Sequence, residues 1–391
     1  MSVKPKLDLM IITSYFPPEI GAASNRIFHL ADGLKSGYNV HVVTPLPNYP
    51  TGKIFSGYRG KLKSKAVENG ILVSRLWLYA SKSKNKFLRL FAMLSYSISL
   101  VWFFIWNKIP KKVIVQSPPL IVAFTCVFFL KSKKRKLILN VSDLWPSAGY
   151  ELGALRKNFS YNLLKRLEVY NYKNAGLILG QSNEILTHID KITTKPELFL
   201  YRNYPDIELK DVTVSSSDHK TLRIVYAGLL GVAQGILRLC QNLNYDNIEL
   251  HIYGSGAEEA DLKSFIESQQ QLPVFFHGRV DRNVLHQELQ NYDLAIIPLL
   301  NRIYGSVPSK IFEYAKLGLP MLYFGGGEGE TIISDNKLGW IAEAGNYDHL
   351  NRVVKSIGKT ETSLEVKKNI QERAYKRFDF GSQLNKLKKE L

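Results

Sequence analysis

The sequence predicts an α/β protein with two domains, each built on a parallel β-sheet. Short apolar segments recur along the 391 residues, and most lead through a glycine-containing loop into a helical pattern. This order is typical of βαβ units, whose strands are parallel. A single core rarely grows beyond roughly 250–300 residues, so a chain of this length is expected to divide. In doubly wound sheets of this kind, ligands bind beyond the carboxyl ends of the strands.

The first βαβ unit opens the chain. Residues 7–14 are apolar enough for a buried strand, and a helical pattern from about Ser24 ends at Gly37. Between them lie Gly21 and two alanines, small residues that would let a ligand approach the backbone at a helix N-terminus. The G-x-G-x-x-G fingerprint of a dinucleotide site is missing. A tight turn without a ligand is the alternative interpretation.

Most of the positive charge lies in one region. Residues 53–136 contain 18 Lys or Arg and one acid, Glu68, and so carry nearly all of the net charge of +18. Within this region, residues 90–106 carry no charge. A membrane-spanning helix would need about 20 apolar residues, and a buried core helix would leave the cations unexplained. A helix in the membrane interface accounts for both features, and the apolar runs argue against a nucleic-acid partner.

The next elements lead to the domain boundary. Residues 113–130 predict a strand, a turn and a helix, and residues 137–141 predict a strand that ends near Asp143. Residues 198–206 and the polar stretch that continues to Lys220, with three consecutive serines, are typical of an interdomain linker. We therefore predict domains over 1–205 and 206–375, followed by a helix over 376–391 that can cross back to pack on the first domain.

A second series of βα units follows the linker. Three of its expected strands end in glycines beside a helical pattern: the run from Gly228 to Gly235, the turn at Gly254, and Gly278 with Arg279. Backbone N–H groups at such junctions suit phosphate.

Residues 293–320 carry the clearest candidate site. An apolar strand over 294–297 and a polar loop precede a helix that starts near Pro308 and stops at Gly318. Lys310 and Glu313 are three residues apart and therefore share one face of this helix. A cation suits phosphate and a carboxylate suits sugar hydroxyls, so the pair indicates a nucleotide-sugar site. A surface helix with two solvated charges is the alternative.

The expected compartment is the cytoplasm. Cys126 and Cys240 provide no disulfide framework, which favours a reducing environment. The apolar patch near the N-terminus is too short for a signal-peptide core.

Five stretches in this order resemble the family 4 glycosyltransferases of the GT-B fold, in particular the branch that builds O-antigen, capsule and exopolysaccharide units on a lipid carrier. The resemblance extends over essentially the whole chain. The stretches are residues 15–19 (Tyr-Phe-Pro-Pro-Glu) with Gly21, 47–52 (Pro-Asn-Tyr-Pro-Thr-Gly), 143–146 (Asp-Leu-Trp-Pro), 226–235, and 308–314 (Pro-Ser-Lys-Ile-Phe-Glu-Tyr).

The resemblance implies two Rossmann-like domains that face a cleft, with the acceptor on the N-terminal, membrane-associating domain and the donor on the C-terminal one. Glu313 would bind the ribose, Lys310 and the 228–235 loop the diphosphate, and Asp143 would be the catalytic residue facing the reacting sugar. The implied donor-binding residues are Gly21, Gly228, Gly231, Gln234, Gly254, Arg279, Ser309, Lys310 and Glu313. Those expected to face the acceptor or an anionic membrane are Asn48, Tyr49, Trp102, Trp106, Trp145, Lys133 and Arg135.

The implied reaction is retaining transfer of a hexose or N-acetylhexosamine, with UDP as the nucleotide, to a polyprenyl-diphosphate-linked saccharide at the cytoplasmic face of the inner membrane. Neither a cofactor nor a metal is implied, and no Asp-x-Asp pair occurs among the 14 aspartates. Backbone N–H groups and cations would then stabilise the leaving group.

Three positions depart from the family pattern. Gly305 stands where a Glu is usual, Gln234 where a Lys is common, and Ser142 where a His is common. A catalytically degenerate membrane-peripheral scaffold and a nucleotide-sugar epimerase of the same fold therefore remain open as alternatives.

Overall fold

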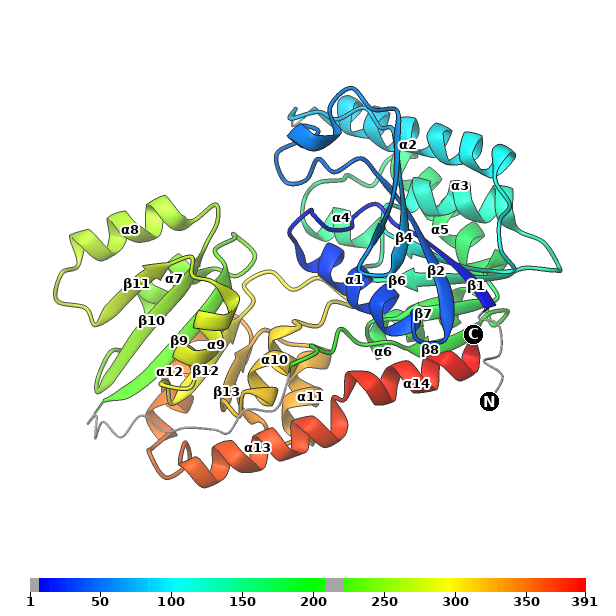
Figure 1. The fold of residues 1–391 in the computed structure, drawn as a ribbon. Helices are drawn as coiled ribbons and strands as arrows, with labels where there is room; N and C mark the ends of the chain where they lie inside the picture. The colour runs from blue at the N-terminus through cyan, green and yellow to red at the C-terminus, as the bar shows by residue number, and fades with distance from the viewer. Residues whose placement is uncertain (1–6, 84, 208–220) are drawn as a thin grey trace. The chain divides into compact units, whose positions relative to one another are not determined.

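The computed structural model of the chain describes residues 7–83, 85–207 and 221–391. It divides into two compact units (Figure 1). The first comprises Met1–Asn203, Tyr304–Ser306 and Gly381–Leu391, and the second comprises Tyr204–Ile303 and Val307–Phe380. The chain passes from the first unit to the second between residues 203 and 204 and returns to the first between residues 380 and 381. The sequence predicts these boundaries at 205/206 and 375/376.

The first unit is built on an eight-stranded sheet in the order β3-β4-β2-β1-β5-β6-β7-β8. Neighbouring strands are parallel except β3 and β4, which form an antiparallel hairpin. The strands are β1 (Leu7–Ile12), β2 (Tyr38–Pro45), β3 (Lys63–Glu68), β4 (Ile71–Leu76), β5 (Lys112–Ser117), β6 (Lys136–Val141), β7 (Leu177–Gly180) and β8 (Glu197–Leu200). The order reverses at β1 and β5, which is where a doubly wound sheet is expected to bind its ligand.

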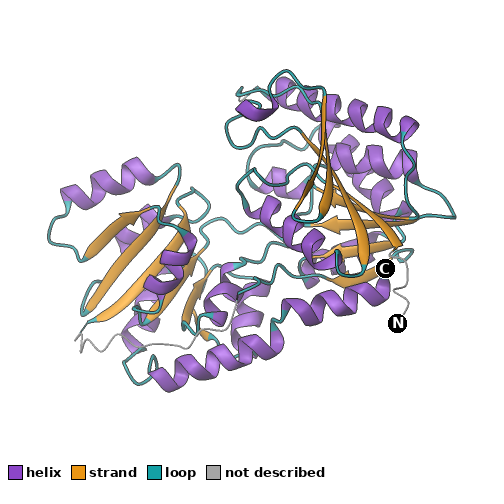
Figure 2. Cartoon of the chain, in the orientation of Figure 1, coloured by secondary structure: helices purple, strands orange, loops and turns teal. Residues whose placement is uncertain are grey.

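Helices alternate with these strands (Figure 2). The side chains of Met10 and Ile12 share a core with Tyr96 and Leu100 of α2, whereas Leu9 and Ile11 point to the opposite face because strand side chains alternate. The helices are α1 (Ala22–Leu34), the 3₁₀ turn η1 (Ser56–Tyr58), α2 (Lys86–Trp106), α3 (Leu120–Leu130), α4 (Ser147–Glu151), α5 (Phe159–Asn174), α6 (Asn183–Ile192) and α14 (Phe380–Glu390).

The second unit has a six-stranded parallel sheet in the order β11-β10-β9-β12-β13-β14. Its strands are β9 (Leu222–Leu229), β10 (Ile248–Ser255), β11 (Val274–Gly278), β12 (Leu294–Pro298), β13 (Met321–Phe324) and β14 (Gly339–Ile341). Its helices are α7 (Ile236–Asn242), α8 (Glu259–Ser268), α9 (Arg282–Leu289), α10 (Lys310–Lys316), α11 (Glu328–Asp335), α12 (Tyr347–Ser356) and α13 (Leu364–Arg377). This is the 3-2-1-4-5-6 order of a Rossmann fold, with its switch point between β9 and β12. The predicted α/β class with two Rossmann-like sheets is confirmed.

The C-terminal helix α14 packs on the first unit. The Gln383 side chain accepts from the backbone N–H of Arg202 and donates to its carbonyl, both at 2.9 Å. Lys388 donates to the Ser36 hydroxyl at 2.8 Å, and Lys136 donates to the Glu390 carbonyl at 2.7 Å. α13 ends at Arg377 and α14 begins at Phe380, so the helix predicted over 376–391 starts four residues later.

Residues 90–106 lie within the single helix α2. Within the described ranges, no helix has the length and apolarity needed to cross a membrane.

The hairpin of β3 and β4 is an element that the sequence analysis missed. Lys63 and Lys65 interrupt any apolar alternation in β3, and charged side chains of this kind are typical of edge strands. The one acid of the basic region, Glu68, accepts a hydrogen bond from the buried Arg75 at 2.9 Å. Arg75 also donates to the Pro17 carbonyl, so the hairpin is anchored to the loop that follows β1.

We predict that Glu68→Ala lowers the free energy of unfolding by about 2 kcal/mol, because it leaves a buried guanidinium without its carboxylate. Urea unfolding measures this change. Glu197→Ala is the matched control, because Glu197 pairs with Lys136 at 3.1 Å but is 65% exposed, and we expect a loss of less than about 1 kcal/mol. Equal effects of the two substitutions would contradict the structural role of Glu68.

Candidate functional site

The candidate donor site lies at the switch point of the second unit. β9 and β12 are neighbours, and Leu294 and Ala295 are in register with Ile224 and Val225. The polar loop after β12 leads into α10, whose apolar side chains Ile311, Phe312 and Ala315 are buried. The helix begins at Lys310, two residues later than the predicted start at Pro308.

Lys310 lies directly against the end of β9. Its ammonium group donates to the carbonyl of Ala227, and a Cβ atom added at Gly228 would lie 2.5 Å from Lys310 Cε. Position 228 therefore has to be glycine for the lysine to lie there. Burial lowers the pKa of Lys310, and the neighbouring Glu313 opposes this by raising it.

Glu313 is held by two residues that the sequence analysis missed. His286 and Arg282, both on α9, donate to Glu313 Oε1 at 2.8 Å and 3.2 Å. Burial alone would raise the pKa of Glu313, but the hydrogen bond from His286 and the charges of Lys310 and Arg282 outweigh it and lower this pKa to about 2. The carboxylate is therefore ionised at neutral pH. The sequence offered one local indication of these two residues: Arg282 and His286 are four apart and therefore share one face of a helix.

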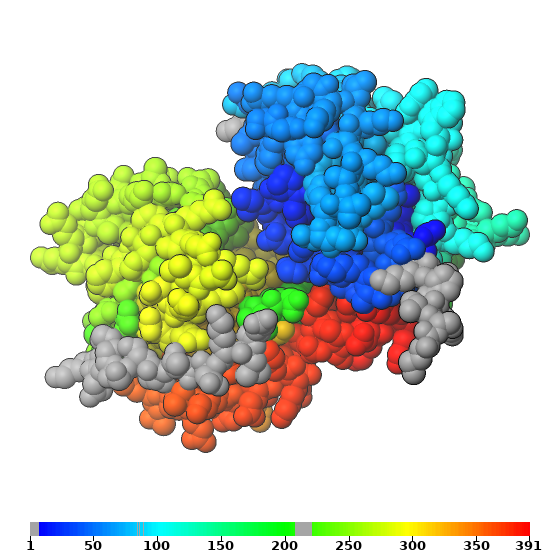
Figure 3. Space-filling model, viewed as in Figure 1, coloured from blue at the N-terminus to red at the C-terminus, as the bar shows by residue number. Residues whose placement is uncertain are grey.

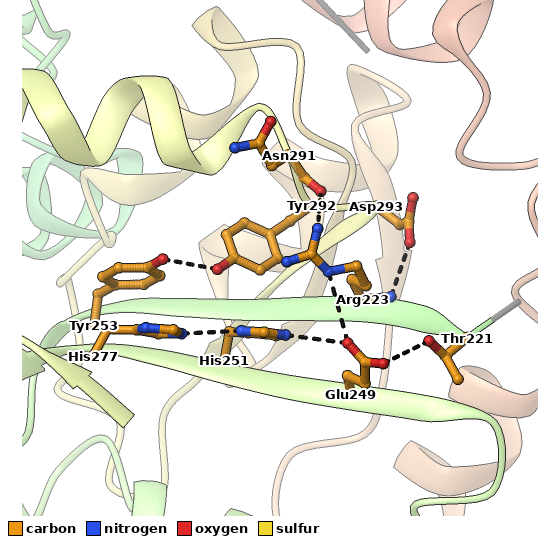
Figure 4. A network of polar contacts seen from close by, with 9 residues as sticks. All are labelled: Thr221, Arg223, Glu249, His251, Tyr253, His277, Asn291, Tyr292 and Asp293. Atoms are coloured by element: carbon orange, nitrogen blue, oxygen red, sulfur yellow. Dashed lines mark hydrogen bonds and ion pairs between the residues drawn. The ribbon is translucent and has the colours of Figure 1, made fainter. Parts of the chain in front are cut away.

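A polar network on the sheet fixes the chain between α9 and β12 (Figure 4). The backbone N–H of Arg223 in β9 donates to Asp293 Oδ2 at 2.8 Å, and the Arg223 guanidinium donates to the Asn291 carbonyl at 3.1 Å. The hydroxyls of Tyr253 and Tyr292 are 2.8 Å apart, and the Arg223 guanidinium lies 4.8 Å from the centre of the Tyr292 ring. Because α9 ends just before these residues, the network helps to position His286 and Arg282.

The glycines in and after β9 and β10 lie where the backbone or a neighbouring side chain leaves little room for a Cβ atom, or where φ is positive. Gly228 and Gly254 are both inside strands and are paired in register, and a Cβ at Gly254 would collide with the Gly228 carbonyl. Gly235 adopts a left-handed conformation with φ 63°, which favours glycine. Gly231 lies beside Gln234, because a Cβ there would be 2.7 Å from Gln234 Oε1.

Two further residues predicted to bind the donor are Ser309 and Arg279. Ser309 directly precedes Lys310 as the N-cap of α10. Arg279 is exposed and follows β11, which is separated from β9 by β10. A role of Arg279 in donor binding stays a prediction.

In the first unit, the loops after β1 and β2 are tied together. Glu19 is buried and accepts the backbone N–H groups of Asn48 and Tyr49 at 2.7 Å and 2.9 Å. A Cβ at Gly21 would be 3.4 Å from the Tyr49 ring. Three of the predicted residues, Gly21, Asn48 and Tyr49, are thus brought together at the switch point of this sheet.

Asp143 follows β6 and is paired electrostatically with a residue the sequence analysis missed. Burial raises the pKa of Asp143, and the charge of Arg26 together with a 3.3 Å hydrogen bond from the Ser142 hydroxyl partly offsets this. Arg26 lies on α1 and is itself buried. Trp145 packs beside Gly149 of α4, where a Cβ would be 2.7 Å from its ring.

Gly305 is held by the first unit through its backbone. Its N–H donates to Glu184 at 2.9 Å, and its carbonyl accepts from the Ser182 hydroxyl at 2.7 Å. Its φ is +85°, and an added Cβ would lie 2.9 Å from Ile185. A glutamate at this position would therefore be strained, which explains the departure from the family pattern.

The remaining predicted residues lie elsewhere. Trp102 and Trp106 are exposed on α2. Lys133 is exposed in the turn after α3, whereas Arg135 donates to the carbonyls of Leu130 and Pro110 at 2.6 Å and 3.1 Å. Among the described residues, no group of three or more His, Cys, Asp or Glu side chains could hold a metal ion.

Residues 211–377 match the family model described as "Glycosyl transferases group 1". This match covers the second unit, which holds Lys310 and Glu313. No curated protein matches the sequence.

Solved structures resemble the whole chain. Sucrose-phosphate synthase from Thermosynechococcus elongatus has a TM-score of 0.74 at 11% identity, over 98% of each chain. Anabaena HepE in complex with UDP has a TM-score of 0.69 at 13% identity, over 98% of this chain and 99% of that one. The lipopolysaccharide outer core galactosyltransferase WaaB has a TM-score of 0.66 at 16% identity, over 98% and 100%. At these identities the likeness establishes the GT-B fold.

We predict a pH signature for Glu313. Because its pKa falls from 4.5 to about 2 on folding, its ionisation stabilises the fold fully above about pH 4.5, and this stabilisation is lost as the pH falls toward 2. The stability difference between wild type and Glu313→Gln should shrink as the pH falls below about 4.5, as measured by urea unfolding. His286→Ala should reduce the difference at neutral pH. A difference that does not change with pH would contradict the assignment.

Proposed function

We propose that the protein is a retaining, metal-independent glycosyltransferase that uses a nucleotide diphosphate sugar, with UDP as the nucleotide. The observation that carries this proposal is the pair of Lys310 and ionised Glu313 at the β9/β12 switch point, inside the segment that matches the glycosyl transferase family. The UDP complex of HepE, a structural neighbour, supports the choice of nucleotide.

Each charge has a distinct role in donor binding. Glu313 accepts hydrogen bonds from the ribose hydroxyls, since its second carboxylate oxygen is not engaged by His286 or Arg282. Lys310 and the backbone N–H groups of residues 228–235 hold the diphosphate and stabilise the charge that develops on the leaving group. Burial lowers the pKa of Lys310, and the charge of the adjacent Glu313 carboxylate opposes this effect.

The acceptor is proposed to be a polyprenyl-diphosphate-linked saccharide in bacterial surface polysaccharide synthesis, bound by the first unit at the cytoplasmic face of the inner membrane. A hexose or N-acetylhexosamine would be transferred. Asp143 is proposed to face the reacting sugar, with Arg26 as a positioning residue that favours its ionised form. The neighbour WaaB, named as a lipopolysaccharide outer core galactosyltransferase, supports a bacterial surface polysaccharide as the product.

A degenerate scaffold is the second candidate, and Gly305 is the observation that favours it. Its backbone is bound by Ser182 and Glu184, and it offers no side chain to a sugar. Turnover of a UDP-sugar by the purified protein with bacterial membrane extract would exclude this candidate.

We predict that Glu313→Ala weakens UDP binding about 10- to 100-fold, which is the cost of losing hydrogen bonds to a charged group. Titration calorimetry with UDP measures this, and Lys310→Met should weaken binding as well. The control is Glu259→Ala, because Glu259 lies on α8, where it forms an i,i+4 pair with Lys263. Unchanged affinity in Glu313→Ala would refute the donor site.

We also predict that Arg26→Met shifts the acidic limb of the kcat/KM profile to higher pH. Removal of the cation raises the pKa of Asp143 further, so that a higher pH is needed to ionise it. Arg26→Lys should restore most of the original profile. An acidic limb that does not move in Arg26→Met would show that Arg26 does not act through Asp143.

A further inference from the structure

Helix α2 is anchored to the first unit by one side only. Tyr96, Leu100 and Phe103 are buried in the core, and the Tyr96 hydroxyl donates toward the carbonyls of Thr13 and Val43 at 3.0 Å and 3.2 Å. This contact rigidly fixes which residues of α2 face outward. The helix is therefore not the fully buried core helix that was one alternative for residues 90–106.

The outward side of α2 is a continuous stripe of large apolar residues. They recur at intervals of one, three or four positions, and so follow one side of the helix along its whole length. Their exposed fractions run from 38% to 81%. They are Phe87, Leu90, Phe91, Leu94, Ile98, Trp102, Ile105 and Trp106.

The neighbouring helix α3 also exposes large apolar side chains. Phe128 and Phe129, near its C-terminal end, are about half exposed and their rings are 5.2 Å apart. Helices α2 and α3 pack against each other, and Figure 3 shows the residues of this region in cyan on the surface of the first unit. We call these two phenylalanines and the eight residues of α2 the apolar face. Soluble monomers rarely expose apolar patches that are continuous over this length.

Exposed cations border the apolar face at the ends of both helices. Lys108 and Lys111 follow α2, and Lys131, Lys133 and Lys134 follow α3. No acid occurs between Glu68 and Asp143, and Glu68 is paired with the buried Arg75. The border therefore carries uncompensated positive charge.

We propose that the apolar face docks on an anionic lipid bilayer, with α2 lying parallel to the membrane surface. The aromatic and aliphatic side chains would enter the headgroup and upper acyl region, and the bordering lysines would contact lipid phosphates. Tryptophan at such a boundary suits both environments, and Trp102 and Trp106 stand together with rings 5.6 Å apart. This surface would bring the enzyme to a lipid-linked acceptor. That role rests on the proposed function, whereas the membrane contact itself does not.

The test is flotation of the full chain with vesicles of phosphatidylglycerol and phosphatidylethanolamine, compared with phosphatidylcholine alone. Wild type should float with the anionic vesicles, and its binding should fall as salt rises because the lipid charge is screened. Ile98→Glu and Trp102→Glu should each reduce binding at least about tenfold. The matched control is Phe159→Glu, because Phe159 on α5 is as exposed as Phe87, at 81%, but lies outside the apolar face.

A second variant separates charge from apolar contact. Lys131→Ser combined with Lys133→Ser and Lys134→Ser should weaken binding and reduce its salt dependence. Brominated lipids should quench the tryptophan fluorescence of wild type more than that of Trp102→Phe with Trp106→Phe. UDP affinity should be unchanged in all variants, which shows that they fold and separates this test from that of the donor site.

Two outcomes would overturn the proposal. One is vesicle binding by Ile98→Glu and Trp102→Glu equal to that of wild type. The other is a dimer in light scattering that Ile98→Glu dissociates, with no vesicle binding by wild type, which would make the apolar face a contact between two copies of the chain.

Discussion

The close contact between Lys310 and the end of β9 is the constraint on which the second unit depends. The ammonium group lies on the Ala227 carbonyl, and a side chain at residue 228 would displace it, whereas a Cβ at the paired residue 254 would collide with the Gly228 backbone. The Tyr314 hydroxyl donates to the same Ala227 carbonyl at 2.9 Å. The contacts of Lys310 and Tyr314 with one carbonyl fix the orientation of α10, and they place a cation and a carboxylate at the β9/β12 switch point.

The protein uses charge differently in its two units. In the second unit, Lys310, Arg282 and His286 surround the carboxylate of Glu313. Their interactions outweigh the effect of burial on its pKa, so the carboxylate stays ionised. In the first unit, the cations of residues 53–136 are mostly exposed, and the same segment contains a single acid, which is itself engaged by Arg75. The first arrangement suits a small anionic ligand, and the second suits an extended anionic surface beside an apolar helix.

Local patterns predicted the elements better than the contacts between them. The strand and helix around residues 294–316 and the sequence strand–turn–helix over 113–130 were predictable, because each follows from apolar periodicity and from Pro or Gly at its ends. The hairpin of β3 and β4 was not, since its lysines hide the alternation of an edge strand. His286 and Arg282 were also missed, because they reach Glu313 across 27 and 31 residues of sequence, and no local pattern reports such a contact.

The sequence by itself determined the two-domain α/β class, the concentration of charge in residues 53–136, and the pairing of Lys310 with Glu313 on one helical face. These are properties of neighbours along the chain, set by side-chain period and composition. Only the tertiary structure decided that Arg26 lies near Asp143, that Gly305 is bound through its backbone, and which side of α2 stays exposed. The burial of a residue depends on residues that are distant in sequence and meet only when the sheets and helices have packed. The pKa values and the exposed surfaces follow from that burial.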